Sequence, residues 1–108
     1  MDAGNLFDGI SRRAGAEVFD ALVATPGLRI ERIVSTGQAT PSGQWLDQEA
    51  EEWVVLLTGG AGLRFEGEAD PRVMRPGDWL HILAHARHRV EWTDGREPTL
   101  WLAVHYSP

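Results

Sequence analysis

The residues of this 108-residue chain that could do chemistry are carboxylates and imidazoles, because it contains no cysteine. Acidic side chains gather between Asp47 and Glu52, and three of the four histidines follow at His81, His85 and His88. Imidazole nitrogens and carboxylate oxygens bind divalent metals, and an imidazole can also act as an acid or base near neutral pH. The acids could equally form a solvated loop. Whether the acidic segment and the histidine segment lie close together depends on the secondary-structure elements that contain them.

Composition narrows the classes of partner. The formal net charge is −6, which disfavours nonspecific binding to nucleic acid or to an anionic membrane surface. The opening segment lacks the basic and apolar regions of a signal peptide, and no apolar run approaches the ~20 residues of a membrane helix. We therefore expect a cytoplasmic protein that binds a small molecule, with no nucleic acid and no membrane as partner. A hydrophobic content of 43% suits one domain with its own core.

Residues 1–27 are expected to form an N-terminal arm that ends in a short helix. The first part, residues 1–13, is mixed in composition and contains glycine. From Ala16 to Ala24 apolar side chains recur at helical spacing, and Pro26-Gly27 would end the helix. These apolar residues are Val18, Phe19, Leu22 and Val23.

Residues 28–108 are expected to form a single β domain. Apolar and polar residues alternate in Leu28–Glu31, Leu63–Glu66 and Arg89–Trp92, as they do on half-buried strands. The Pro-Gly pair within Arg75–Asp78 favours a turn. Short strands with turn signals about every ten residues indicate a sandwich or a barrel.

Two segments fit a helix as well as a strand. Asp47–Leu57 could be a helix with acids in its first turn, although Val54-Val55 and the glycines that follow favour a strand. Asp78–His88 could be a helix that presents its three histidines on one face, at spacings of four and three. A helical protein with a histidine face is therefore an alternative to the β domain.

Two spacings in the centre of the chain are informative together. Glu52 stands seven residues before Gly59, and Gly77-Asp78 begins a segment in which His88 lies eleven residues after Gly77. In these features residues 43–92 resemble the two sequence motifs of the cupin family, whose members are small antiparallel barrels of the jelly-roll type. The resemblance implies an all-β fold, a cupin-type jelly-roll β-barrel following the short N-terminal helix. It also implies strand, sharp turn and strand for the second ambiguous segment.

The resemblance is incomplete at the positions that hold metal. The family's first motif has two histidines one residue apart, four or five residues before the glutamate, and counting back five from Glu52 gives Trp45 and Asp47. In the second motif, three residues stand where the family has proline, glycine and asparagine. They are Leu83, His85 and Trp92.

In a typical cupin three histidines and a glutamate hold one divalent metal inside the barrel. The resemblance implies that Glu52 and His88 belong to such a set here, that Asp47 could coordinate through oxygen, and that His85 could supply a second imidazole. Such ligands suit Zn, Fe, Mn or Ni. A metal-binding cupin that acts on a small organic substrate is the first hypothesis, although the sequence does not name a reaction.

A metal-free module that binds or senses a small molecule is the second hypothesis, because Trp45 puts an apolar ring at a ligand position. Trp45 and Trp92 would then line the pocket. His105 would reach it if that face of the last strand points inward.

A homodimer is also expected. The strand that begins at Glu52 is apolar on both faces, so its outer face needs a cover. Either a second copy of the chain or the helix expected at Ala16–Ala24 could supply it. Arg87 and Arg89 alternate with His88 and are expected to point away from the interior.

Overall fold

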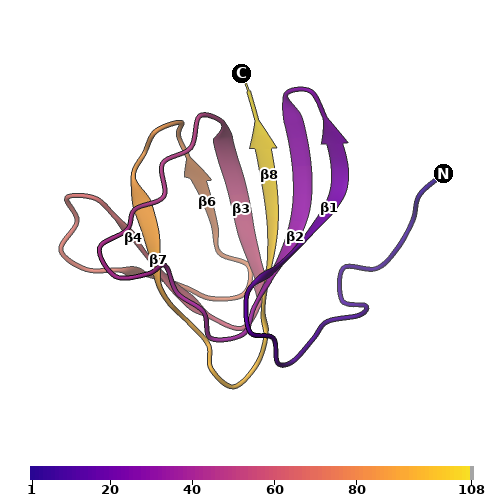
Figure 1. Cartoon of the computed structure of the whole chain (residues 1–108), viewed down its shortest axis with the longest axis horizontal. Helices are drawn as coiled ribbons and strands as arrows, with labels where there is room; N and C mark the ends of the chain where they lie inside the picture. Colours follow the sequence, from indigo (N-terminus) through magenta and orange to yellow (C-terminus); the bar gives the residue numbers. More distant parts are fainter. Residues whose placement is uncertain (108) are drawn as a thin grey trace.

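The computed structural model describes residues 1–107 as two antiparallel β-sheets, drawn in Figure 1. The five-stranded sheet has the order β1-β2-β8-β3-β6, formed by β1 (Val18–Thr25), β2 (Leu28–Ser35), β8 (Thr99–Tyr106), β3 (Glu51–Thr58) and β6 (Trp79–Ile82). The three-stranded sheet has the order β5-β4-β7, formed by β5 (Arg72–Met74), β4 (Ala61–Phe65) and β7 (His88–Thr93). The all-β prediction is confirmed. Pro108, the last residue of the expected domain, lies outside the described residues.

Both ambiguous segments form strands. Glu51–Thr58 is β3, and the second segment is β6, a turn, and the start of β7. Residues 1–107 contain no helix, so the alternative of a histidine-bearing helix is wrong. Accordingly, none of the described residues belongs to a helix that could cross a membrane.

The expected N-terminal helix is also wrong, because its residues form β1. This strand pairs with β2 through a hairpin whose two-residue turn is Pro26-Gly27, with Gly27 at φ 81°. A β-bulge between Ala21 and Val23 adds one residue to the strand. A bulge shifts the phase of the side chains that follow it, and this shift produced apolar pairs that resemble helical spacing.

The hydrophobic core lies where the two sheets face each other. Val54, Leu56, Trp101 and Ala103 come from the five-stranded sheet, and each is no more than 4% exposed. Partners from the second sheet complete the cluster, and they include Ala61, Leu63 and Met74. Because alternate residues of a strand face the same side, the residues between these core positions point outward.

A segment that we call the strap, residues 38–48, runs beside β7 and closes one side of the barrel. Leu46 and His88 exchange backbone hydrogen bonds of 2.7 and 3.1 Å, and Thr40 N donates to Val90 O at 2.9 Å. This pairing fixes which strap residues face the interior.

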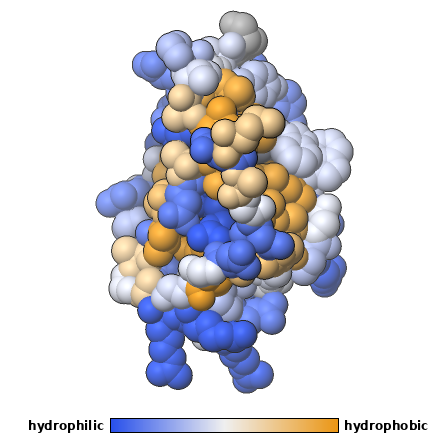
Figure 2. All heavy atoms as spheres, turned by 90° about the vertical axis from the view of Figure 1, so that its right-hand side faces the viewer, coloured by the Kyte–Doolittle hydropathy of each residue, from blue (hydrophilic) through white to orange (hydrophobic). Residues whose placement is uncertain are grey.

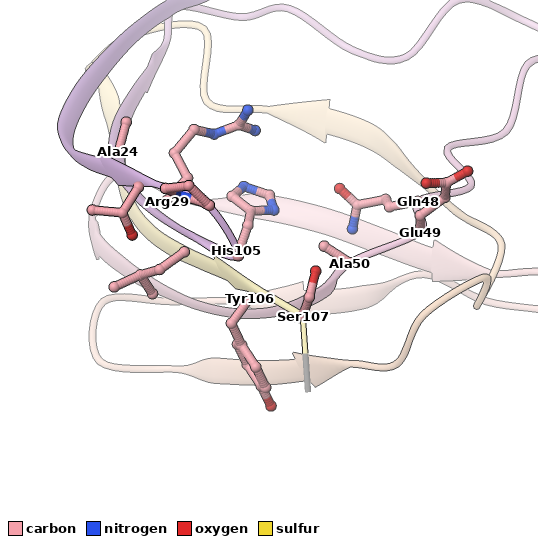
Figure 3. Close-up of a pocket in the computed structure, with 12 residues that line it drawn as sticks. Ala24, Arg29, Gln48, Glu49, Ala50, His105, Tyr106 and Ser107 are labelled. Carbon is pink, nitrogen blue, oxygen red and sulfur yellow. The ribbon is translucent and has the colours of Figure 1, made fainter.

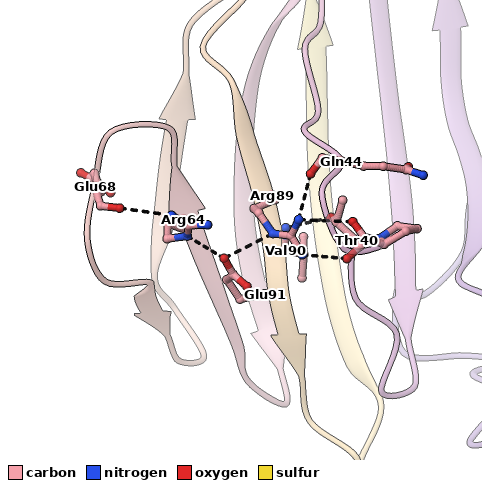
Figure 4. A network of polar contacts seen from close by, with 8 residues as sticks. Thr40, Gln44, Arg64, Glu68, Arg89, Val90 and Glu91 are labelled. Atoms are coloured by element: carbon pink, nitrogen blue, oxygen red, sulfur yellow. Dashed lines mark hydrogen bonds and ion pairs between the residues drawn. The ribbon is translucent and has the colours of Figure 1, made fainter.

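Arg89 holds the strap from outside the barrel (Figure 4). Its guanidinium donates to the backbone oxygens of Thr40, Gln44 and Pro41 at 2.9, 3.0 and 3.2 Å. Arg89 Nε lies 3.2 Å from Glu91 Oε1, an ion pair by distance without hydrogen-bond geometry. The side chain points away from the interior as expected, yet Arg89 is only 9% exposed because the strap covers it.

With β1 in place of the expected helix, no helix within residues 1–107 covers the outer face of β3. Trp53 on that face stacks on Trp79, which is 59% exposed, with ring centroids 6.1 Å apart. Figure 2 shows hydrophobic side chains exposed on the side of the molecule where β1 forms the edge of the sheet, and Phe19 is 57% exposed there. The homodimer stays a prediction.

Candidate functional site

A cavity of about 570 Å³ lies between the two sheets, and it is the candidate site. Its size is typical of sites for small organic molecules. The polar part of its lining includes Arg29, Glu31, Gln48, Glu52, His88 and His105. The apolar part includes Ile33, Val54, Leu63, Ile82, Val90 and Trp101. Three of the residues singled out from the sequence, Glu52, His88 and His105, therefore share one cavity.

Polar side chains form a row at one end of the five-stranded sheet. Glu52 on β3 pairs in register with His105 on β8, and His105 pairs with Arg29 on β2. This end of the sheet carries the β1–β2 turn and the C-terminus, at the top of Figure 1. Deeper along the same strands the inward positions are apolar, as at Val54 and Trp101. The cavity therefore has a polar end and an apolar floor.

Glu52 and His88 are both buried, at 8% and 3% exposure. Glu52 Oε1 accepts a hydrogen bond of 2.9 Å from Gln48 Nε2. His88 Nδ1 lies 2.8 Å from the backbone oxygen of Ala86. Since a carbonyl oxygen only accepts, Nδ1 carries a proton, and the neutral ring keeps its lone pair on Nε2.

A second acid, which is buried, and a largely covered imidazole stand beside them. His105 Nε2 lies 3.0 Å from Glu31 Oε1, and Arg29 Nε lies 3.3 Å from Glu31 Oε2. The histidine and glutamate side chains are 12% and 8% exposed. Sequence reasoning missed Arg29 and Glu31 because polar residues of an alternating strand normally face solvent. Nothing in Leu28–Glu31 itself signals that these two face inward.

An outer hollow of about 560 Å³ adjoins the cavity at its polar end. Arg29, Gln48 and His105 line both spaces, so they mark the boundary between them. Figure 3 shows the side chains of these three residues reaching into the space between β2, β8 and the strap. A ligand that enters from this end meets polar side chains first.

Asp47 and His85 lie apart from the cavity and contact each other. His85 Nδ1 is 2.8 Å from Asp47 Oδ1, and the two side chains are 66% and 47% exposed. His85 has a φ of 61°, the left-handed conformation that a glycine adopts without strain. The four predicted metal ligands thus separate into an interior pair, Glu52 and His88, and a surface pair.

Asp47 lies on the surface because of the register of the strap. Between residues 44 and 48 the strap lines the cavity with Gln44, Leu46 and Gln48, so Trp45 and Asp47 face outward. A shift of one residue moves every side chain of an extended segment to the other face. The family's other spacing, four residues before Glu52, therefore gives the inward positions, and these are Leu46 and Gln48.

Trp45 and Trp92 were expected to line the pocket, and the structure places both elsewhere. Trp45 points outward from the strap, where the guanidinium of Arg64 lies 5.0 Å from its ring centroid. Trp92 packs across Gly62, and a Cβ on this glycine would lie 2.8 Å from Trp92 Cδ1. Both tryptophans therefore contribute to packing on the outside of the barrel.

His81 also lies outside the barrel. Its Nε2 is 2.8 Å from Glu51 Oε1 and 2.8 Å from the hydroxyl oxygen of Tyr106. Loss of hydration and the neighbouring carboxylate raise the pKa of the Tyr106 hydroxyl above its ordinary value. This cluster is separated from the cavity by the sheet.

The residues present do not match the metal centre that the fold family implies. Leu46 supplies no ligand atom, and Gln48 supplies an amide where the family has imidazole. Within residues 1–107 no group of three or more histidine, cysteine, aspartate or glutamate side chains is placed to hold a metal ion. Of the four predicted ligands only Glu52 and His88 line the cavity, and structural or catalytic zinc sites use at least three protein ligands.

Comparisons with solved structures agree with this architecture. A protein from Ralstonia eutropha JMP134, described provisionally as a mannose-6-phosphate isomerase, is 55% identical over the whole of both chains, with a TM-score of 0.97. A cupin superfamily protein from Desulfitobacterium hafniense DCB-2 is 17% identical, with 92% of this chain and 84% of that one covered and a TM-score of 0.75.

An RmlC-like cupin with a double-stranded β-helix fold, from Methanocaldococcus jannaschii, is 17% identical. The match covers 90% of this chain and 85% of that one, with a TM-score of 0.71. No protein-family model and no curated protein matches the sequence. The two distant likenesses concern the fold.

Proposed function

Because the chain has the fold of cupin superfamily proteins, we propose that it uses the barrel cavity to bind a small organic molecule without a metal ion. The cavity has the volume of a small-molecule site, an apolar floor and a few buried polar groups at one end. In this proposal the protein retains the cavity of the cupin fold but binds no metal ion in it.

One observation carries the proposal: Leu46 and Gln48 line the cavity at the strap positions where the family has its two histidines. A metal centre of the family type needs imidazoles there. Gln48 instead donates its amide to Glu52, so the carboxylate that would bind a metal is held by a neutral side chain. A hydrogen-bonded carboxylate of this kind orients a polar ligand.

A metal-dependent enzyme is the second candidate. The observation that favours it is that Glu52 and His88 line one cavity and that His88 Nε2 lacks a hydrogen-bond partner within residues 1–107. Ligand oxygens or water would have to complete the coordination of such a metal. Two strong ligands bind divalent metals more weakly than three or four.

Sugar-phosphate isomerisation, suggested by the description of the Ralstonia relative, finds less support in the cavity. A phosphate group needs cationic side chains or a cluster of free backbone amides. Arg29 is the only arginine or lysine that lines the cavity, and Glu31 already neutralises it. We therefore propose that phosphorylated sugars are not the ligands of this cavity.

Metal loading tests the proposal. We expect protein purified without a histidine tag, incubated with Zn, Fe(II), Mn or Ni salts and then desalted, to retain far less than one metal ion per chain. Elemental analysis by mass spectrometry gives the stoichiometry directly. The physical reason is that Glu31 and His105 contact each other, and within residues 1–107 no three such side chains are placed to hold a metal ion together.

His88→Ala and His85→Ala form a matched pair for this measurement. Each removes one imidazole, but His88 lines the cavity whereas His85 is on the surface. One retained metal ion per chain that disappears in His88→Ala and persists in His85→Ala would refute the metal-free proposal and favour the second candidate.

A further inference from the structure

The buried carboxylate of Glu52 has no cationic partner among residues 1–107. It is 8% exposed, and its hydrogen bond comes from Gln48, whose amide is neutral. The other buried carboxylate of the cavity, Glu31, has the Arg29 guanidinium as its cationic partner and a hydrogen bond from His105 Nε2. Burying an unpaired charge is costly. A ligand with a positive charge would therefore gain the most binding free energy beside Glu52.

The neighbouring imidazoles present acceptors to the cavity. His88 uses Nδ1 to donate to the Ala86 carbonyl, which leaves the lone pair of Nε2 in the neutral ring. His105 uses Nε2 toward Glu31, which leaves the lone pair of Nδ1. A ligand that satisfies these groups has to donate hydrogen bonds.

The charge balance of the lining agrees with a cationic ligand. Three carboxylates line the cavity, from Glu17, Glu31 and Glu52, against one guanidinium from Arg29. Arg29 is 53% exposed and engaged with Glu31, so the guanidinium lies toward the entrance. An anion would meet the uncompensated carboxylate of Glu52 in the interior, whereas a cation is attracted to it.

The rest of the cavity is apolar. Below the polar row, Ile33, Val54 and Trp101 line the five-stranded sheet, and Leu63 and Val90 line the facing sheet. These side chains would remove apolar ligand surface from water, at about 25 cal/mol for each Å² that is buried. The ligand therefore combines a charged donor with an apolar body.

We infer that the ligand of this cavity is a small organic primary amine whose ammonium group lies beside Glu52 and whose apolar body faces Val54 and Trp101. The ammonium has three N–H donors, which suit the Glu52 carboxylate and the free nitrogen of His88. The inference rests on the proposed metal-free binding function and names the class of its ligand.

Isothermal titration calorimetry with three probes of one shape tests the inference. Benzylamine is cationic near neutral pH, benzyl alcohol is neutral and benzoate is anionic. We expect benzylamine to bind at least about tenfold more tightly than benzyl alcohol, because a buried charge-assisted hydrogen bond is about twice as strong as a neutral one. Benzoate should give no saturable binding.

Glu52→Gln and Glu49→Gln give matched variants. Each removes one negative charge, but Glu49 is exposed and lines the outer hollow only. We expect Glu52→Gln to lose the tenfold preference for the amine and Glu49→Gln to keep it. Circular dichroism checks that both variants fold, and the comparison of the three probes on the unchanged protein depends on no variant.

Several outcomes would overturn the inference. Equal or tighter binding of benzyl alcohol or benzoate would reject the ammonium and leave metal-free binding in place. The absence of saturable benzylamine binding would reject the amine class. Failure of the proposed function itself is distinguishable, because it shows as a stoichiometric metal ion in the loading experiment.

Discussion

Replacing Arg89 with methionine is expected to lower the free energy of unfolding by about 3 kcal/mol. Methionine preserves much of the apolar stem but removes the donors that bind the backbone oxygens of Thr40, Pro41 and Gln44 (Figure 4). These carbonyls come from the strap, and the site is 9% exposed, so water replaces the lost bonds poorly. Urea unfolding followed by tryptophan fluorescence measures the change.

Arg87→Met is the matched control for this prediction. Arg87 donates to Glu66 at 2.7 Å and lies within 6.0 Å of the Trp45 ring centroid, but its side chain is 45% exposed. An exposed ion pair contributes little, so we expect a loss below about 1 kcal/mol. Hydrogen exchange should also increase in residues 38–48 of Arg89→Met alone. Equal, small losses in the two variants would contradict the role given to Arg89.

Gly59→Ala is expected to destabilise the protein by about 3–4 kcal/mol. Gly59 has a φ of 79°, and a Cβ there would lie 2.7 Å from the Cα of Thr99. The obstacle is backbone of β8, which pairs with both β2 and β3 and cannot move alone. Thermal unfolding by differential scanning calorimetry measures the loss.

Gly77→Ala separates the cost of the positive φ from the cost of the close contact with Thr99. Gly77 has a similar φ of 93°, yet a Cβ there would have no atom within 4 Å. We expect only the backbone cost of about 1–2 kcal/mol. If Gly59→Ala costs no more than Gly77→Ala, close contact with Thr99 is not what demands glycine at position 59.

The strands could be predicted from the sequence wherever local pattern and pairing agree. β2 and β7 alternate in sequence, β8 is an apolar run, and the turn at Gly77 is supported by a hydrogen bond from Asp78 N to Arg75 O of 2.9 Å. β1 could not be predicted, because its bulge at Leu22 disguises the strand period and its pairing with β2 is a tertiary effect.

Three of the seven side chains that the sequence suggested for the site, Glu52, His88 and His105, line the cavity. Glu52 and His88 are fixed by motif spacings that run along regular strands, so counting residues places them correctly in the cavity. The strap is irregular, and either family spacing fits its sequence. Only the pairing of Leu46 with His88 shows that Gln48, rather than Asp47, faces Glu52.

The remaining residues depend on contacts that no local pattern encodes. Arg89 and Trp45 are covered because the strap runs beside β7. The two segments lie some 45 residues apart along the chain. In sequence Glu31 looks like an ordinary polar strand residue. Only the pairing of β2 with β8 places it beside His105. These are consequences of tertiary register.

The central claim is that Glu52 and His88 share a cavity that takes an organic ligand and no metal. A crystal structure of the untagged protein grown with zinc chloride and benzylamine, with anomalous data at the zinc edge, tests both parts at once. We predict benzylamine in the cavity with its nitrogen within hydrogen-bond distance of Glu52, and no anomalous peak there. A zinc peak bound by Glu52 and His88, with the amine absent, would contradict the account.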